Sequence, residues 1–239
     1  MELSGFSIAR AGASPEENED AITWQFAGDS GCLMAVSDGA GETSFARMWA
    51  WLLVDSASEL TQPGFGDRVI EALQEQWCRE VGSKVLPWYA EEKARKGAFA
   101  TFLACRIEKT KEGYDYTATA IGDSCLFHLR QGLILDSFPL SDPHAFDYRP
   151  LLVGARGPFP FEKQILGKQG FLQPGDELWL ATDALARGLL EEPHSLPREL
   201  AEIPFSDDSS AIDDLIQRLR AEKRIRNDDT SLVRLVTGA

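Results

Sequence analysis

Four short acidic motifs are the residues of this chain best suited to chemistry: Asn18-Glu19-Asp20, Ser37-Asp38-Gly39-Ala40-Gly41, Thr182-Asp183 and Asp228-Asp229-Thr230. Apolar runs adjoin three of them, which is typical of residues at the tips of buried strands. Carboxylates gathered at one end of a sheet repel one another unless cations lie between them. The sequence therefore indicates a site for hard divalent metal ions, which prefer oxygen ligands.

Composition narrows the class of protein that could carry such a site. The 239 residues are 44% hydrophobic, which is enough for one substantial core, and we expect a single domain over residues 1–239. The net charge of -14 argues against nucleic acids and anionic membrane surfaces as partners, because both would be repelled. The four cysteines show no paired spacing, so free thiols are expected rather than disulfides or zinc ligands. These cysteines are Cys32, Cys78, Cys105 and Cys125.

Neither an export signal nor a membrane span is visible. The N-terminus carries no basic segment followed by an apolar stretch, and no window approaches the roughly 18 apolar residues of a membrane helix. We therefore expect a soluble, cytoplasmic protein.

Hydrophobic patterns predict strands first, helices next and then strands again. Strands are expected at residues 3–9, 21–26, 32–37, 100–107, 114–121, 126–130, 177–182 and 231–236. Residues 141–173 are interrupted by proline and glycine, so this is the longest stretch predicted to be irregular, and long loops are often functional.

Apolar stripes at helical spacing predict three helices. The stripes are Trp49, Leu52, Leu53 and Ala57 in the first helix; Ile70, Leu73, Trp77 and Val81 in the second; and Ile212, Leu215, Ile216 and Leu219 in the third. Pro87 is expected to kink or end the second helix, and the charged residues beyond it are expected to form a solvated face without a function.

Five motifs in this order resemble those of the metal-dependent, type 2C serine/threonine protein phosphatases, in a short bacterial-like form. They are residues 18–21 (NEDA), 36–41 (VSDGAG), 120–124 (AIGDS), 175–183 (GDELWLATD) and 228–233 (DDTSLV). The resemblance covers essentially the whole chain. It implies an α+β fold, a four-layer αββα sandwich of two antiparallel sheets flanked by helices, with two Mn²⁺ or Mg²⁺ ions at one end.

The resemblance also implies roles for individual residues. Asp38 would bridge the two metal ions, and the carbonyl of Gly39 would bind one of them. Glu19 would reach that same ion. Asp183 and Asp228 would hold the other.

A hydroxide between the two ions would then attack phosphoserine or phosphothreonine of a protein substrate, because paired metals lower the pKa of water and stabilise the transferring phosphoryl group. Asp20 would support metal-bound water, so Asp20 and Asp38 are the residues expected at the chemical step. Asp123 matches a position that can help to hold a third, weaker ion. A phosphorylated protein, and a kinase that acts in opposition, are the implied partners in signalling.

Departures from the family pattern affect the binding of the substrate phosphate. Better-known members carry Arg five positions before the Asp of the first motif, where this chain has Pro15. Arg10 is the nearest upstream candidate to bind phosphate; Arg47 and Arg156 are others, although surface positions are more typical for all three.

Three further positions bear on the site. Ala40 stands near a His thought to act as general acid in eukaryotic members, so metal-bound water or solvent would protonate the leaving group. Ala184 follows Asp183 where Gly is usual, which would be strained if the position required a positive φ. His144 lies where the family has a flap beside the active site and could touch the substrate, although solvation of a loop is the more usual explanation for such a residue.

Other interpretations remain open. Taken singly, the acidic residues are also typical of turns and helix N-caps. A pseudophosphatase that binds a partner without chemistry is the main alternative, and a calcium-binding protein is a weaker one because the acids are spread along the chain. The acidic overall charge favours basic or neutral phosphosegments as substrates.

Overall fold

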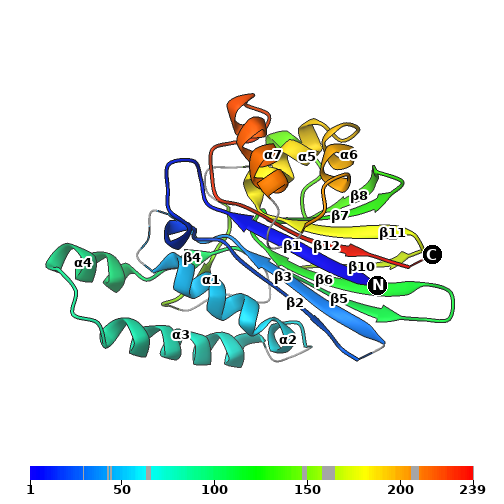
Figure 1. Cartoon of the computed structure of the whole chain (residues 1–239). Helices are drawn as coiled ribbons and strands as arrows, with labels where there is room; N and C mark the ends of the chain where they lie inside the picture. The colour runs from blue at the N-terminus through cyan, green and yellow to red at the C-terminus, as the bar shows by residue number, and fades with distance from the viewer. Residues whose placement is uncertain are drawn as a thin grey trace.

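The structure is a computed structural model that describes residues 1–28, 30–41, 43, 45–62, 66–146, 150–157, 165–205 and 210–238. Two large antiparallel sheets face each other, and helices cover both outer faces (Figure 1). This arrangement confirms the predicted αββα sandwich. None of the described helices has the length and apolar character needed to cross a membrane.

The first sheet has the strand order β1-β12-β11-β7-β8. Its strands are β1 (Glu2–Ile8), β7 (Cys125–Arg130), β8 (Leu133–Phe138), β11 (Asp176–Ala181) and β12 (Thr230–Val236). Because the first and last strands of the chain pair antiparallel, the N-terminal acidic motif and the C-terminal one are brought to the same end of this sheet.

The second sheet has the order β10-β6-β5-β3-β2. Its strands are β2 (Ala21–Phe26), β3 (Gly31–Ser37), β5 (Phe102–Lys109), β6 (Tyr114–Ile121) and β10 (Leu166–Leu172). A short pair, β4 (Phe99–Ala100) and β9 (Val153–Gly154), lies beside it.

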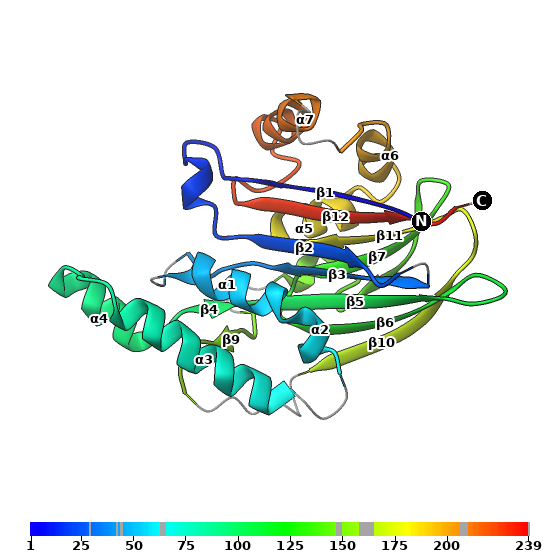
Figure 2. The same cartoon turned by 60° about the horizontal axis from the view of Figure 1, so that its bottom comes forward.

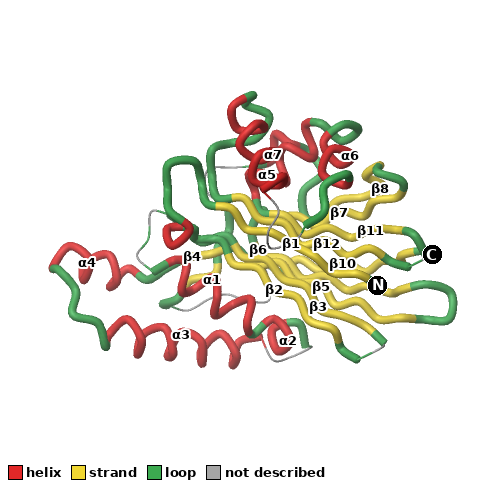
Figure 3. The backbone as a smooth tube through the Cα atoms, viewed as in Figure 1, coloured by secondary structure: helices red, strands yellow, loops and turns green. Residues whose placement is uncertain are grey.

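Helices form the two outer layers, as the helix colouring of Figure 3 makes clear. On the side of the second sheet lie α1 (Ala46–Asp55), α2 (Ala57–Leu60), α3 (Gly66–Gly82) and α4 (Trp88–Lys96). The other face is covered by α5 (Asp183–Glu191), α6 (Leu196–Ala201) and α7 (Ser210–Ala221). Single-turn 3-10 helices occur at Pro15–Glu17 and Pro143–Ala145.

Three buried clusters hold the layers together. One lies between the sheets and includes Met34 and Leu180, and the others lie between each sheet and its helices. The predicted apolar stripes account for the outer clusters: Trp77 of α3 and Leu219 of α7 are fully buried. Burial of a large apolar side chain contributes roughly 1.5–3 kcal/mol, so these stripes attach the helices to the sheets.

Several sequence predictions need correction. Residues 141–173 are not irregular throughout, because Leu166–Leu172 forms an edge strand paired with β6. Two Gly residues weaken its strand pattern, and the strand is stabilised by pairing with β6 and by burial of Leu172 between the sheets. Within that stretch, residues 147–149 and 158–164 lie outside the described part of the chain. Pro87 does not simply end a helix: it caps α4, which projects beyond the sheets (Figure 2). The charged residues of α4, such as Glu91 and Lys96, are exposed as predicted. The first predicted helix is divided, and Ala57 begins α2.

The cysteine prediction is confirmed: the four thiols are free, and Cys32, Cys105 and Cys125 are buried.

Candidate active site

Strand ends from both sheets converge at one end of the sandwich. In the first sheet, Ile8 pairs with Thr230 and Ala181 pairs with Cys125. In the second sheet, β3 ends at Ser37. Each of these positions lies within two residues of a predicted site residue. The motifs that are far apart in sequence are therefore neighbours in space.

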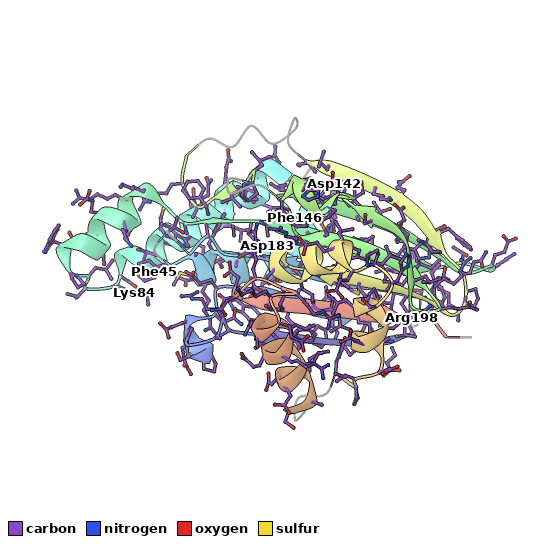
Figure 4. All side chains as sticks on the ribbon, turned by 90° about the horizontal axis from the view of Figure 1, so that it is seen from above. Phe45, Lys84, Asp142, Phe146, Asp183 and Arg198 are labelled. Atoms are coloured by element: carbon purple, nitrogen blue, oxygen red, sulfur yellow. The ribbon has the colours of Figure 1, made fainter. Side chains whose placement is uncertain are left out.

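A depression of about 490 Å³ lies at this end. Its lining includes seven of the eight predicted site residues: Arg10, Glu19, Asp38, Gly39, Asp123, Asp183 and Asp228. Asp183 can be found in Figure 4 at the beginning of α5. The eighth predicted residue, Asp20, does not line this depression but a neighbouring one, which Arg10 also lines.

Asp38 follows β3, and hydrogen bonds between its backbone and Thr101 hold it in place. Its N–H donates to Oγ1 of Thr101 at 2.9 Å, and its carbonyl accepts from the N–H of Thr101 at 2.9 Å. The Thr101 hydroxyl also bonds to Oγ of Ser124 at 2.8 Å, in the turn that carries Asp123. Burial raises the pKa of Asp38 well above its usual value, and the charges of Asp20, Asp183, Asp123 and Asp228 raise it further. The carboxylates are thus close enough to repel one another.

Glu19 approaches the backbone of the Asp-Gly motif closely. A Cβ at Gly39 would lie 2.8 Å from the carbonyl oxygen of Glu19, and a Cβ at Gly41 would lie 2.8 Å from its Oε2. Only glycine permits this approach. Burial raises the pKa of Glu19 to about 7, opposed by the positive charge of Arg10 and assisted by Asp229 and Asp228.

Asp123 lies in the turn between β6 and β7. Gly122 precedes it with φ +105°, and a Cβ at Gly122 would meet the Thr101 side chain at 2.7 Å. Oδ1 of Asp123 is buried and has no hydrogen-bond partner among the described residues. Burial raises the pKa of Asp123 to about 7, and the charge of Asp183 adds to the effect. A buried carboxylate oxygen without a donor is the type of atom that a cation would satisfy.

Asp183 is the first residue of α5, and Thr182 rather than Asp183 is the N-cap. Burial and the charge of Asp228 raise its pKa. Ala184 is buried in the first turn of α5 and does not have a positive φ, so the strain considered for this position is absent.

Asp228 and Asp229 have different surroundings. The side chain of Asp228 lines the depression, and its carbonyl accepts from the guanidinium of Arg220 at 2.7 Å. Asp229 is buried and accepts the backbone N–H groups of Arg10 and Glu19, both at 2.8 Å. Asp229 therefore joins the N-terminal and C-terminal acidic motifs, a role that sequence reasoning missed.

Asp20 connects the site to the sheets. Its Oδ2 accepts from the hydroxyls of Thr182 at 2.9 Å and Ser231 at 2.7 Å, while Oδ1 is buried without a partner among the described residues. Burial raises its pKa to about 8, although both hydroxyls oppose that shift.

Two arginines lie among these acids. Arg10 NH1 is 3.6 Å from Oδ2 of Asp229 and 4.0 Å from Oε2 of Glu19. Arg226 NH1 is 3.8 Å from Oδ2 of Asp183. Both line the depression. Sequence reasoning missed Arg226, although its place two residues before Asp228 was a usable signal.

The other candidates for phosphate binding lie elsewhere. Arg47 donates to the carbonyl of Pro15 at 2.9 Å, and Arg156 stacks on Trp77. Neither lines the depression. His144 does not line the depression either, and its backbone N–H donates locally to Oδ1 of Asp142 at 2.8 Å.

The donor set fits hard divalent cations. The predicted side-chain ligands are all carboxylates, which suit Mg²⁺ and Mn²⁺. Two buried carboxylate oxygens, Oδ1 of Asp20 and Oδ1 of Asp123, accept no hydrogen bond from the described residues. Within the described residues, however, no three acidic, His or Cys side chains already form a cluster that could hold an ion. The charge of these carboxylates is offset in part by Arg10 and Arg226, and also by Arg220 and Arg187.

A comparison with models of protein families shows to which family the chain belongs. The model of the family described as protein phosphatase 2C matches residues 10–233. The chain belongs to the protein phosphatase 2C family. Membership places it among the protein phosphatases, and the resemblance inferred from the five motifs is confirmed. No curated protein matches the sequence.

Solved structures share the protein phosphatase 2C fold. The Mycobacterium tuberculosis serine/threonine phosphatase PstP/Ppp is 17% identical, with 100% of this chain and 99% of that chain covered and a TM-score of 0.64. The photosystem II phosphatase PBCP is 16% identical, with coverage of 100% and 99% and a TM-score of 0.63. The catalytic domain of PstP in complex with two manganese ions is 18% identical, with coverage of 100% and 98% and a TM-score of 0.59.

Proposed function

We propose that this protein is a Mn²⁺- or Mg²⁺-dependent phosphatase that hydrolyses phosphoserine and phosphothreonine in proteins. One observation carries the proposal: acidic residues from four separate parts of the chain converge at the ends of both sheets, where burial and mutual repulsion raise their pKa values. Such an arrangement costs folding stability unless cations bind to it. The manganese ions bound by the related PstP domain support the same conclusion.

The residues that would hold the ions are Glu19, Asp38, the Gly39 carbonyl, Asp183 and Asp228, with Asp123 beside a third ion. Two bound divalent cations would supply the positive charge that activates water and stabilises a transferring phosphoryl group. Thr101 would keep Asp38 in place through its two backbone hydrogen bonds. Asp20, which is held by Thr182 and Ser231, would orient a water molecule beside the ions.

Arg10 is the residue proposed to bind the substrate phosphate. Its guanidinium lines the depression, and its side chain is 39% exposed, so it is accessible to a substrate. A guanidinium is suited to this task because its planar donors match phosphate oxygens in pairs. Arg226 faces the same depression beside Asp183 and would contribute a second positive charge.

A pseudophosphatase is the second candidate. It is favoured by the positions of Arg10 and Arg226, whose guanidinium groups already offset part of the charge of the carboxylates in the absence of metal. Such a protein would bind a partner through the same surface and would not catalyse hydrolysis.

Metal-dependent hydrolysis of p-nitrophenyl phosphate and of a phosphothreonine peptide tests the proposal. Wild-type protein should turn over both substrates with Mn²⁺, and Asp38→Asn and Asp183→Asn should abolish the turnover while circular dichroism shows an intact fold. Isothermal titration with Mn²⁺ separates the two candidates. Metal binding without turnover would support the pseudophosphatase, and absence of metal binding at millimolar Mn²⁺ would contradict the metal-dependent enzyme.

A further inference from the structure

Part of the depression that holds the acidic residues is lined by apolar side chains. Three of its lining residues, Phe99, Pro150 and Leu152, carry neither charge nor a polar side-chain group. We call these three residues the apolar wall. The depression has a volume of about 490 Å³, and pockets of roughly 300–1,000 Å³ hold ligands much larger than one phosphoryl group. The depression therefore has room for more of a substrate than its phosphate.

The short strand pair of β4 and β9 explains why the wall faces the depression. Ala98, Ala100 and Val153 are fully buried in the core between the second sheet and its helices. Side chains alternate between the two faces of a strand, so Phe99 and Leu152 point away from that core. In the described part of the chain neither residue belongs to a buried cluster, and both are partly exposed. Their side chains are thus available to a ligand.

Backbone contacts attach Phe99 to the acidic motif that follows β3. The N–H of Ala40 donates to the carbonyl of Phe99 at 2.9 Å, and Gly39 forms a bridge with Ala100. On its other side β4 pairs with β9, where Phe99 lies opposite Gly154 (Figure 2). A Cβ at Gly154 would lie 3.1 Å from Cε1 of the Phe99 ring, so the ring covers this glycine closely. Phe99 is therefore a fixed part of the site.

Leu152 is held from both sides by the backbone of its neighbours. A Cβ at Gly122 would lie 3.1 Å from the carbonyl oxygen of Leu151, so the chain before β9 passes close to the Gly-Asp turn between β6 and β7. The indole N–H of Trp49 in α1 donates to the carbonyl of Val153 at 2.9 Å. These contacts present Leu152 to the depression without the help of a ligand.

The polarity of the depression separates two kinds of contact. The proposed metal and phosphate ligands, such as Asp38 and Arg10, would bind the phosphorylated group, and the apolar wall lines the same depression. Because consecutive Cα atoms of a peptide are only 3.8 Å apart, the residues next to a bound phosphoresidue would lie within reach of the wall. A nonpolar side chain gains free energy by leaving water there, whereas a carboxylate would be repelled by the acidic residues.

We propose that the apolar wall holds a nonpolar side chain of the phosphoprotein substrate, next in sequence to the phosphorylated residue. This inference rests on the proposed function and adds a substrate class to it: phosphorylated sites that have residues such as leucine beside them. Exposed apolar groups rimmed by polar residues are typical of such contact sites. The preference is for a neutral, apolar neighbour, which also agrees with the acidic charge of the chain.

Binding of two fluorescein-labelled peptides in the presence of Mn²⁺ tests the inference. Both carry a phosphonate analogue of phosphoserine, in which carbon replaces the ester oxygen so that no hydrolysis occurs. They differ only in having leucine or asparagine on both sides of that residue. Fluorescence anisotropy should show roughly three- to tenfold tighter binding of the leucine peptide, the effect of burying about half of a leucine side chain. The difference should persist at 0.5 M NaCl, because salt screens ion pairs and not apolar burial.

Leu152→Asn is the informative variant, and it should reduce the preference for the leucine peptide to less than roughly twofold. Phe99→Leu keeps an apolar side chain but shortens the wall, so it should reduce the preference to a smaller extent. The matched control is Leu135→Asn, because Leu135 is 51% exposed on the edge strand β8 and does not line the depression. The control should keep the wild-type preference. Thermal unfolding checks the fold of each variant.

Three results would overturn the inference: equal affinity of the wild type for the two peptides, an unchanged preference in correctly folded Leu152→Asn, or absence of binding by either peptide. A dimer seen by sedimentation velocity in the wild type but not in Leu152→Asn would make the wall a contact between two copies, and would overturn it as well. Hydrolysis of the asparagine-flanked phosphoserine peptide with Mn²⁺ is measured separately. Absence of that hydrolysis would contradict the proposed function, whereas the anisotropy results would still decide whether the wall selects apolar neighbours.

Discussion

Arg10 contacts Asp229 twice: its backbone N–H donates to Oδ1 at 2.8 Å, and its guanidinium lies 3.6 Å from Oδ2. The same carboxylate accepts the N–H of Glu19. One buried side chain near the C-terminus therefore positions both the proposed phosphate ligand and a proposed metal ligand from the N-terminal loop.

Replacing Asp229 with alanine should destabilise the fold and disorganise the site. Two backbone N–H groups would lose their acceptor, and each unsatisfied group costs about 1–3 kcal/mol. Urea unfolding should show a loss of about 2–6 kcal/mol, and kcat/KM for p-nitrophenyl phosphate should fall. Asp229→Asn keeps one acceptor oxygen and should have an intermediate effect. The exposed Asp115→Ala serves as the control; an equal loss of stability in that variant would contradict the role assigned to Asp229.

Arg10→Ala should weaken catalysis without a comparable effect on stability. Hydrogen bonds to a charged group are worth about 1.5–3 kcal/mol, which corresponds to a fall of roughly tenfold to 150-fold in kcat/KM. Arg10→Lys should recover only part of the loss, because an ammonium cannot pair with two phosphate oxygens in one plane. Arg79→Ala, on the exposed face of α3, should have no effect. If Arg10→Ala kept wild-type kcat/KM, another residue would have to bind the phosphate.

Thr101→Val should displace Asp38 although the side chains have nearly the same shape. The change removes the acceptor of the Asp38 N–H and the partner of the Ser124 hydroxyl. We expect a loss of about 1–3 kcal/mol in stability and weaker Mn²⁺ binding by calorimetry. Thr101→Ser keeps the hydroxyl and should retain the affinity for Mn²⁺. A valine variant with unchanged affinity would show that Asp38 needs no such support.

Gly39→Ala should be among the most damaging small substitutions. The added Cβ would lie 2.8 Å from the Glu19 carbonyl oxygen and 3.0 Å from the carbonyl carbon of Ala46, and both atoms belong to the backbone. The two acidic motifs would have to move apart, so thermal stability and metal-dependent turnover should both decrease. Gly82→Ala is the matched control, since its Cβ would meet nothing within 4 Å. Normal turnover by Gly39→Ala would contradict the close approach of these motifs.

Without metal, the protein should lose stability as the pH rises from about 4 to about 8. Burial raises the pKa of Glu19 and Asp123 to about 7 and that of Asp20 to about 8. Above the ordinary carboxyl pKa of about 4, the folded state therefore binds more protons than the unfolded state, and stability falls with increasing pH through this window. Thermal unfolding at pH 5.5 and at pH 8 measures the effect.

Mg²⁺ or Mn²⁺ should reverse that trend, because metal ions bind the ionised carboxylates and stabilise the folded state. The rise in Tm on adding metal should be larger at pH 8 than at pH 5.5. The double variant Glu19→Gln, Asp123→Asn should show a flatter dependence of Tm on pH without metal. Equal metal-induced shifts at both pH values would contradict the assignment of these carboxylates.

The types and order of the acidic motifs could be identified from the amino-acid sequence because each motif is local. An Asp-Gly pair after a buried apolar run, or Asp183 after the run Leu178 to Ala181, is recognisable without any knowledge of distant contacts. Periodicity likewise predicted β2 and β6 with their observed bounds. These features depend on residues within a few positions of one another, where side-chain type and spacing dominate.

Tertiary structure alone decided which groups surround the acids. Strand β10 has a weak local pattern and exists through pairing with β6, and the positions of Arg10 and Arg226 beside the carboxylates depend on Asp229 and on the loop packed against Gly188. Long-range hydrogen bonds and close packing fix these contacts, and such contacts leave no periodic signal along the chain.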